Sequence, residues 1–197
     1  MPNGSTYETL LEQLDGLQES ACGALIAIDG RCGSGKSTLA ARLARRYGGV
    51  VVHMDDFYLP PEERQPHWME RVGGNMDFQR LRREVLCPLR EGKEALYRPY
   101  LCKTGEYGEE TVLAPGSFVI LEGSYSHHPA LDTPFDRKIF LTCDARTQQQ
   151  RLQAREGERF ERFKEIWIPL EERYFAMYGV QAGADLVLDT GAEGGGA

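Results

Sequence analysis

Five apolar runs of strand length alternate along the chain with segments whose apolar residues recur at helical spacing. The first run, GALIAID, precedes KSTLAARLARRYG, a pattern that predicts a strand buried on both faces and then a helix closed by Gly48. GVVVH, FVILE, RKIFLTC and ADLVLD predict four more strands. Strands alternating with helices favour an α/β fold, here with a mostly parallel five-stranded sheet and helices on both faces.

The segments between these runs predict further elements. Periodic apolar residues predict a helix within residues 1–20 and another over 77–89. Strand-like stretches around a glycine-containing turn predict a hairpin over 94–114. Asp144 is expected to cap a helix over 145–155, and a helical stretch over 160–179 is expected to kink or break at Pro169.

The chain is expected to form one domain over residues 1–197, with no internal repeat and no linker between domains. Within it we expect a substrate-covering insertion at 59–115 and a lid at 151–163. The glycine-rich tail, 191–197, is of low complexity and is expected to be disordered.

Composition narrows the function classes. Of the 197 residues, 41% are hydrophobic and 27% are charged, as in ordinary globular proteins. A net charge of -7 argues against nucleic acid and anionic membranes as partners, so any phosphate site must be a local positive pocket. Five cysteines without a C-x-x-C pair indicate reduced thiols. With no signal-peptide pattern and no apolar run of membrane-spanning length, we expect a cytoplasmic protein.

The segment GRCGSGKST matches the phosphate-loop pattern G-x-x-x-x-G-K-[ST] and lies between a predicted strand and a predicted helix. Glycines let successive backbone N–H groups turn toward phosphate, and the helix adds its positive N-terminus. A lysine then reaches the β- and γ-phosphates, and a hydroxyl ligates Mg²⁺. The alternative is a glycine-rich turn that matches by coincidence. The predicted ATP-binding residues are Gly30, Cys32, Gly33, Ser34, Gly35, Lys36, Ser37 and Thr38.

Acidic residues end two of the predicted strands. GVVVH leads to Asp55 and Asp56, and FVILE ends at Glu122. Ligands of open parallel sheets bind beyond the carboxyl ends of the strands, where Lys36 and Ser37 also belong. Mg²⁺ takes oxygen ligands, so these acids are candidates to assist a magnesium nucleotide. The alternatives are a capped turn for the Asp pair and a solvated strand end for Glu122.

The motifs IDGRCGSGKST, HMDDFYLP, GGNMDF, RPY and VILEGSY occur in an order that resembles the uridine kinase and phosphoribulokinase superfamily, and uridine kinase-like proteins in particular. The resemblance spans residues 24–189, and the DDFY, NMD and EG elements are its more specific parts. It implies a P-loop NTPase fold, ATP and Mg²⁺ as cofactors, and transfer of a phosphoryl group to a small molecule.

The resemblance also implies roles for single residues. Asp55 matches the acid that takes the proton of the ribose 5′-hydroxyl near Mg²⁺, whereas Asp56 stands where the family often has Ser. Glu122 matches an acid associated with Mg²⁺, so the implied metal-site residues are Ser37, Glu122 and Asp55.

The acceptor side carries three further candidates. Tyr58 matches an aromatic residue of the nucleoside pocket, Asp77 an acid that holds ribose hydroxyls, and Tyr100 a residue that contacts the base. Asp77 could equally cap the helix that follows, and Tyr100 could be a cross-strand packing residue. YLCKTGE lacks the His that uridine kinases carry after this Tyr, and FQR replaces their DHP, so the resemblance does not secure uridine as the acceptor.

Arg151, Arg155, Arg159 and Arg162 follow the fourth strand at spacings that would place them on one helical face. Phosphoryl transfer needs cations over the transferring group, and the resembled family places such arginines in a mobile lid. Arg151 and Arg155 fit the lid spacing R-x-x-x-R, and Arg159 is a further ATP-binding candidate. The alternative is a solvated charged helix, because glutamates are interspersed.

The adjacent His127 and His128 lack a third ligand at metal spacing and are expected on a loop at the site's rim. Together these patterns predict an ATP-dependent kinase that phosphorylates a small-molecule hydroxyl, favouring the 5′-hydroxyl of uridine or cytidine. Asp55 is the predicted base, and Lys36, Arg151 and Arg155 stabilise the transferring group. Pantothenate or a sugar is an alternative acceptor. A nucleotide-dependent switch is the alternative of another class, although the guanine-reading N-K-x-D is absent from the sequence.

Overall fold

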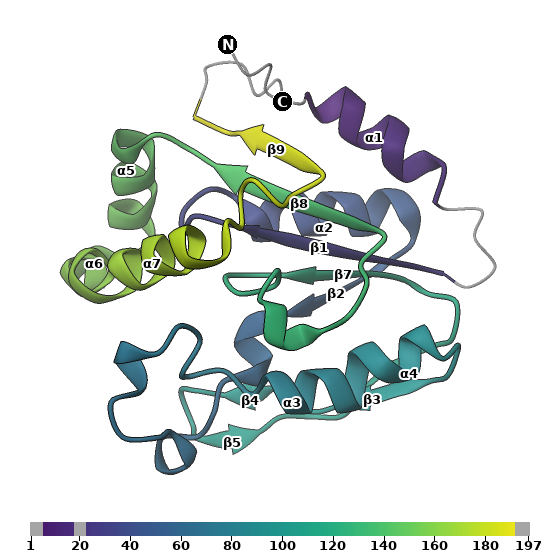
Figure 1. Ribbon diagram of the computed structural model, residues 1–197, viewed down its shortest axis with the longest axis horizontal. Coiled ribbons are helices and arrows are strands. Elements are labelled where there is room, and N and C mark those ends of the chain that lie inside the picture. Colours follow the sequence, from purple (N-terminus) through teal and green to yellow (C-terminus); the bar gives the residue numbers. More distant parts are fainter. Residues whose placement is uncertain (1–5, 18–22, 192–197) are drawn as a thin grey trace.

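Five strands form one parallel sheet in the order β2-β7-β1-β8-β9 in the computed structural model, which describes residues 6–17 and 23–191. β1 lies at the centre, and all five strands point their carboxyl ends to the same edge, toward α5 to α7 (Figure 1). The predicted α/β class and five-stranded sheet are therefore confirmed. The strands are β1 (Ala24–Gly30), β2 (Val50–His53), β7 (Phe118–Glu122), β8 (Arg137–Thr142) and β9 (Leu186–Asp189).

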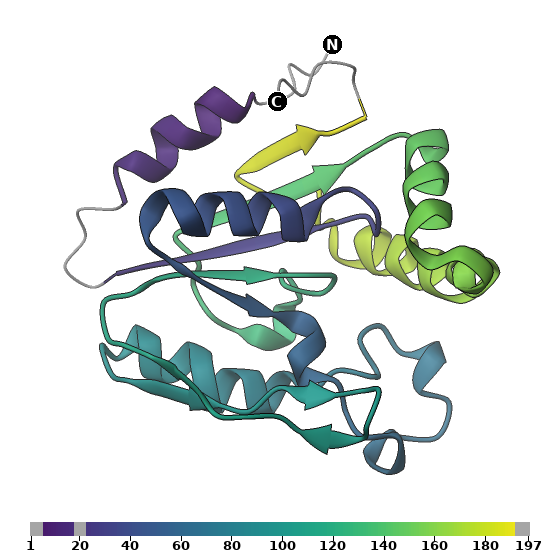
Figure 2. The same cartoon turned by 180° about the vertical axis from the view of Figure 1, so that it is seen from behind.

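Helices cover both faces of this sheet because successive strand residues point to opposite sides. Ile26 and Ile28 of β1 pack in one core with residues of α1 and α2, which Figure 2 shows on the near side of the sheet. Leu25 belongs to the second core, beneath the helical segment 78–90 and α7. The helices are α1 (Tyr7–Asp15), α2 (Lys36–Tyr47), α3 (Phe78–Leu81), α4 (Cys87–Arg90), α5 (Ala145–Glu156), α6 (Phe160–Arg162) and α7 (Ile168–Tyr178).

The N-terminal helix has the predicted place and ends earlier than its apolar pattern suggests. Thr6 caps α1, and its hydroxyl accepts a hydrogen bond from the Thr9 N–H at 3.2 Å. Except for Gly191, the tail that we expect to be disordered lies outside the described residues. None of the described helices is long and apolar enough to cross a lipid bilayer.

The run GVVVH predicts a buried strand, and β2 is less buried than that prediction. It is an edge strand that pairs only with β7, and Val50 is 37% exposed. Val52 is fully buried in one core and Val51 is partly buried against the other, so the run VVV packs on both faces only after its exposed first residue. Sequence periodicity could not separate an edge strand from a central one in so short a run.

A second layer lies beside β2 and contains the predicted helix and hairpin (Figure 1). Asp77 caps a continuous helical segment in which a π-helical turn, Arg82–Leu86, joins α3 to α4. The hairpin has two antiparallel pairs, β3 with β6 and β4 with β5. Its strands are β3 (Ala95–Tyr97), β4 (Tyr100–Leu101), β5 (Glu106–Tyr107) and β6 (Thr111–Leu113).

The lid region is helical but broken. Asp144 caps α5 as predicted, accepting a hydrogen bond from the Thr147 N–H at 2.9 Å. α5 ends at Gly157, whose φ of 56° and ψ of -122° do not continue a helix. The expectation of four arginines on one helical face is therefore wrong, because Arg159 and Arg162 lie beyond this break. A π-helical turn, Phe163–Trp167, then leads into α7 at Pro169.

Candidate functional site

The loop between β1 and α2 is shaped by three glycines with positive φ angles: 136° at Gly30, 77° at Gly33 and 94° at Gly35. A Cβ atom at Gly30 would lie 2.0 Å from the carbonyl oxygen of Leu141 in β8, so the close approach of the two strands requires glycine there. Gly35 is the N-cap of α2 and makes no side-chain capping bond, which leaves the first amide groups of the helix available to an anion.

Lys36 folds back over this loop. Its Nζ donates hydrogen bonds to the carbonyl oxygens of Gly30 at 2.7 Å and Arg31 at 3.0 Å. Among the ion pairs between described residues, none involves Lys36. The ammonium is held at the loop without a neutralising carboxylate, as a phosphate-binding lysine would be. Of the other loop candidates, Ser34 is buried and Thr38 is exposed in the first turn of α2.

Glu122, the last residue of β7, joins the loop to the edge strand. Its buried Oε1 accepts a hydrogen bond from Ser37 Oγ at 3.0 Å and lies 2.6 Å from Nδ1 of His53. The hydrogen bond between the Glu122 carboxylate and the His53 ring raises the pKa of His53. Sequence reasoning did not find His53, although it ends β2 directly opposite Glu122 in the strand register.

The side chains near Glu122 suit a Mg²⁺ ion that arrives with a nucleotide better than a metal ion bound by protein side chains alone. Ser37 offers a hydroxyl oxygen and Glu122 a carboxylate oxygen, and the charges of Glu122 and Lys36 both act on the nearby Asp55. Within residues 6–17 and 23–191, no three His, Cys, Asp or Glu side chains are grouped so that they could hold a metal ion. Mg²⁺ usually keeps several waters and takes phosphate oxygens, so the oxygen donors present fit an ion that arrives with a nucleotide.

Asp55 and Asp56 lie in a 3₁₀ turn, Met54–Phe57, directly after β2. The side chain of Asp55 is accessible, but the surrounding protein still removes enough solvent to raise the pKa of its carboxyl group. Asp56 is held on the other side of the turn. Its Oδ2 accepts a hydrogen bond from the Tyr97 hydroxyl at 3.3 Å, and its backbone carbonyl accepts one from Arg80. Asp55 is thus the acid of this pair whose carboxylate stays accessible, and among the groups that shift its pKa only the Tyr58 hydroxyl is a side-chain hydrogen-bond partner.

The three acceptor-side candidates lie in the second layer. Tyr58 forms a β-bridge with Met76, and burial raises the pKa of its hydroxyl. Asp77 Oδ1 accepts a hydrogen bond from the Arg80 N–H at 2.9 Å, so it caps the following helix whatever else it does. Tyr100 is buried and packs edge-on against its cross-strand partner Tyr107, with ring centroids 5.6 Å apart. Both alternatives raised from the sequence therefore describe real contacts.

The arginines of the lid region have different surroundings. Arg151 reaches the phosphate loop: its guanidinium donates to the carbonyl oxygen of Gly33 at 3.3 Å and to both oxygens of Thr190 at 2.9 and 2.8 Å. Arg155 and Arg159 are exposed and both pair with Glu156, at 2.7 and 3.3 Å. Arg151 is the one that already touches the loop.

α7 holds the phosphate loop through residues that sequence reasoning passed over. The guanidinium of Arg31 donates to both carboxylate oxygens of Glu172, at 2.7 and 2.9 Å. The Cys32 N–H, which we expected to face ATP, donates to Glu171 at 2.9 Å. Burial raises the pKa of the Cys32 thiol, in keeping with a small packing residue rather than a nucleophile. In the sequence, the only sign of this role was the adjacent acidic pair Glu171 and Glu172 in the predicted helix.

Asp29 ties the base of the loop to two more segments. Its Oδ2 accepts hydrogen bonds from the Tyr174 hydroxyl at 2.8 Å and the His127 N–H at 2.9 Å. The expectation that His127 and His128 lie at the rim of the site is wrong, because each is only 8% exposed. The loop after β7 turns back under the sheet and packs both rings inside.

Comparison with protein families gives one match over most of the chain. The family model described as an AAA domain matches residues 26–167, which include most of β1, the glycine-rich loop, β2 and α5. No curated protein matches this sequence.

Several solved structures share the fold at low sequence identity. A protein from Bacillus stearothermophilus, proposed to be a uridine kinase, is 22% identical with a TM-score of 0.66, and the match covers 91% of this chain and 99% of that one. A protein from Silicibacter sp. TM1040, proposed to be a fructose transport system kinase, is 22% identical with a TM-score of 0.72 over 93% and 99%. YFH7 from Saccharomyces cerevisiae, proposed to be a P-loop kinase with a circular permutation, is 13% identical with a TM-score of 0.63 over 95% and 98%. The expected P-loop NTPase fold is confirmed.

Proposed function

The chain belongs to the AAA domain family, and from this premise we propose that it is an ATP-dependent phosphotransferase that moves the γ-phosphoryl group of ATP to a hydroxyl group of a small molecule. The observation that carries the proposal is the position of Asp55. Its accessible carboxylate lies at the carboxyl edge of the sheet, close enough to Lys36 and Glu122 for both charges to affect its pKa. In this proposal the phosphate site and the Asp55 carboxylate face one another.

In this proposal the loop and its neighbours bind the donor. The amide groups of residues 33–38 and the Lys36 ammonium bind the phosphates, and Ser37 with Glu122 holds Mg²⁺, with Asp55 beside them. The bound Mg²⁺ supplies charge neutralisation for the β- and γ-phosphates. α7 keeps the loop in shape through Glu171 and Glu172.

Asp55 then orients the acceptor hydroxyl and takes its proton while the hydroxyl oxygen bonds to the γ-phosphorus and the bond to the leaving ADP oxygen breaks. Negative charge spreads over the transferring group, where Lys36 and arginines of the lid region stabilise it. Arg151 already lies at the loop, and Arg155 would have to leave Glu156 to take part. Closure would also exclude water and so limit hydrolysis of ATP.

We further propose that the acceptor is a nucleoside, phosphorylated at its 5′-hydroxyl, with uridine and cytidine as the favoured candidates. In this proposal Tyr58 and Tyr100 provide aromatic surface for the nucleobase, and Asp77 provides a carboxylate for the ribose hydroxyls. In this reading residues 59–115 form the acceptor-site insertion and 151–163 the lid of a single domain. One structural neighbour carries a description as a uridine kinase and another as a fructose transport kinase, so sugars belong in any test.

The test is a panel of acceptors incubated with the full chain, ATP and Mg²⁺, and read by mass spectrometry for one added phosphoryl group. We expect uridine or cytidine to be phosphorylated and ADP to form in equal amount. Phosphorylation of fructose or pantothenate instead would keep the reaction type and replace the acceptor. ATP hydrolysis that no acceptor changes, with nucleotide-dependent binding of a partner, would overturn the proposal in favour of a nucleotide switch.

A further inference from the structure

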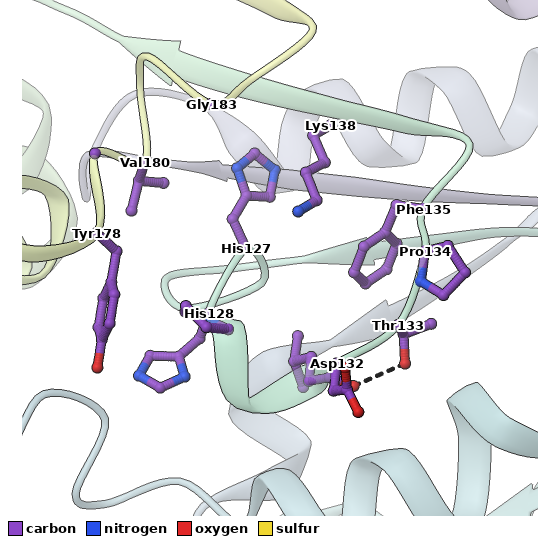
Figure 3. Close-up of a pocket in the computed structure, with 13 residues that line it drawn as sticks. His127, His128, Asp132, Thr133, Pro134, Phe135, Lys138, Tyr178, Val180 and Gly183 are labelled. Atoms are coloured by element: carbon purple, nitrogen blue, oxygen red, sulfur yellow. Dashed lines mark hydrogen bonds between the residues drawn. The ribbon is translucent and has the colours of Figure 1, made fainter.

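Of the four histidines in the chain, His53 is the one that contacts a residue proposed to hold Mg²⁺. His127 and His128 instead border a hollow of about 410 Å³ between the loop that follows β7 and the segment that follows α7 (Figure 3). His67 is exposed. The phosphotransferase described above gives His53 no role, although its ring lies against the proposed metal site.

The register of two parallel strands brings His53 to Glu122. The two residues lie opposite one another at the ends of β2 and β7. Residues two positions apart on a strand point to the same face of the sheet, and Val51 and Ile120, two positions earlier, pack in the core that contains α2. His53 and Glu122 therefore lie on the face that α2 covers, where Ser37 is in the first turn of that helix.

The carboxylate of Glu122 is held by two donors. Its side chain is only 6% exposed, and buried polar groups are normally hydrogen-bonded. Ser37 Oγ lies 3.0 Å and His53 Nδ1 lies 2.6 Å from the same oxygen, Oε1. Because an ionised carboxylate only accepts, Nδ1 carries the proton of its bond. Within the described part of the chain, no donor bonds to Oε2.

These two donors differ in what else they would do. Ser37 is itself a proposed ligand of Mg²⁺ through its hydroxyl oxygen, so its bond to Glu122 competes with metal binding. His53 has no such second task, and its ring is half-exposed on the edge strand of the sheet. It can keep its bond to Oε1 when the metal is bound and leave the other carboxylate oxygen available.

We propose that His53 is a positioning residue, whose Nδ1–H holds the Glu122 carboxylate in the orientation that receives the Mg²⁺ of the nucleotide. This inference rests on the donor site of the proposed function. Carboxylates that bind metal are hydrogen-bonded in turn, and loss of such a partner typically costs about 10–100-fold in metal affinity or activity. The alternative is an exposed ion pair that contributes little, and the burial of Glu122 argues against it.

The test measures metal binding without turnover. The full chain is saturated with ADP, and its affinity for Mn²⁺, which accepts the same oxygen ligands as Mg²⁺, is measured by electron paramagnetic resonance. His53→Phe keeps a flat ring and removes the donor, so the Kd for Mn²⁺ should rise about 10–100-fold. The Kd for ADP in EDTA, which reports the glycine-rich loop and Lys36, should stay within about threefold of the wild type.

Three further variants separate positioning from a general structural role. His53→Asn offers an amide N–H close to the place of Nδ1, so it should bring the Kd for Mn²⁺ back to within about threefold of the wild type. Glu122→Gln should weaken Mn²⁺ binding, and adding His53→Phe to it should weaken binding no further, because the histidine acts through that carboxylate. Val50→Thr, at an exposed position of the same edge strand, should leave both affinities unchanged.

The contrary outcomes are distinguishable. If the wild type binds ADP and Mn²⁺ and His53→Phe binds Mn²⁺ equally well, the positioning role is wrong and the proposed function stands. An equal loss of ADP affinity in EDTA would also overturn the positioning role, because a distorted loop would account for both losses. A wild-type chain that binds no ADP would overturn the proposed function together with this inference.

A second readout uses the wild-type chain and so does not depend on the folding of His53→Phe. In the chain labelled with ¹⁵N-histidine, adding Mg²⁺ to the ADP complex should shift the resonances of the His53 ring and keep Nδ1 protonated. The resonances of the buried His127 and His128 should stay in place. A His53 ring that Mg²⁺ leaves unmoved, or whose Nδ1 loses its proton, would contradict the positioning role.

Discussion

At the residue scale, the neighbouring acids Asp55 and Asp56 differ in what surrounds them. Tyr97 and Arg80 hold Asp56 by its side chain and its backbone, whereas the Asp55 carboxylate stays accessible near Lys36. The strand before the pair predicted that both would reach the ligand edge. Their separation depends on the 3₁₀ turn of residues 54–57, which adjacent acids in a sequence do not reveal.

The raised pKa of Asp55 predicts a gain in stability when its charge is removed. In the folded state desolvation disfavours the carboxylate, so ionisation costs folding free energy above that pKa. Below the pKa of the unfolded chain, about 3.9, the group is protonated in both states and the cost disappears. Asp55→Asn should therefore raise Tm at pH 7 and raise it less at about pH 4.5.

Thermal unfolding followed by circular dichroism measures this effect. Asp15→Asn is the control of opposite sign, because the Tyr47 hydroxyl bonds to that carboxylate and lowers the pKa of Asp15. A lower Tm for Asp55→Asn at pH 7 would contradict the raised pKa.

His128 predicts a second, pH-dependent effect on stability. Its pKa is lowered to about 4 by burial, below the 6.5 of an ordinary His. The stability that comes with a neutral, buried His128 is fully present above the unfolded pKa of about 6.5. It is lost as the pH falls from there toward 4, because in this range the unfolded chain binds the proton and the folded chain does not. Between pH 7 and pH 5 the wild type should lose about 2 kcal/mol more unfolding free energy than His128→Phe. Urea unfolding at the two pH values measures it, and the exposed His67→Asn variant should behave as the wild type does.

At the element scale, two prolines that should end helices are accommodated by π-helical turns. Pro88 follows the π turn at 82–86, and Pro169 follows the one at 163–167. A proline clashes with the carbonyl group four residues earlier, and a wider turn in front of it relieves that clash. The sequence predicted helices at both places and a kink or break at Pro169. Proline itself does not specify whether a helix breaks or widens.

α7 makes a specific prediction about the phosphate loop. Glu171 is buried and accepts a hydrogen bond from the Cys32 N–H, so Glu171→Ala leaves a buried donor without a partner. We expect the free energy of unfolding to fall by about 1–3 kcal/mol and the KM for ATP to rise. Chemical denaturation and initial-rate kinetics measure the two effects. Glu165→Ala, at an exposed position of the preceding π turn, should change neither, and equal behaviour of the two variants would refute the anchoring role.

A substitution at Arg155 tests the proposed catalytic role of the lid without a large effect on the stability of the fold. The Arg155 guanidinium is exposed, forms an ion pair with its neighbour Glu156 and lies 5.6 Å from the centre of the Phe163 ring. Exposed contacts of this kind contribute little, so Arg155→Ala should leave Tm within about 1 °C of the wild type. If Arg155 moves onto the transferring phosphoryl group, kcat should fall by about 10²-fold. Arg45→Ala, at an exposed arginine in the last turn of α2, provides the control with full kcat. Unchanged kcat in Arg155→Ala would show that Arg155 takes no part in phosphoryl transfer.

At the scale of the whole molecule, strand patterns predicted the α/β class because each buried strand is a continuous apolar run bounded by polar residues. The order of the strands could not be predicted from the sequence, because it depends on contacts between residues far apart in the chain, such as Ile28 and Glu122 in adjacent strands. The glycine-rich loop, like the α/β class, could be predicted, because its motif is a local pattern in the sequence. The anchoring of that loop by α7 could not, because Arg31 and Glu172 meet only through the fold.

The central claim concerns the carboxyl edge of the sheet: we propose that the phosphate loop at the end of one strand and the Asp55 base after another act on one acceptor. The most direct measurement is the rate of phosphoryl transfer from ATP to the best acceptor of the panel in wild type, Asp55→Asn and Asp56→Asn. The account predicts a fall in turnover of about 10²–10⁴-fold for Asp55→Asn, the range for loss of a general base, and less than about tenfold for Asp56→Asn. Turnover that survives in Asp55→Asn and disappears in Asp56→Asn would contradict it.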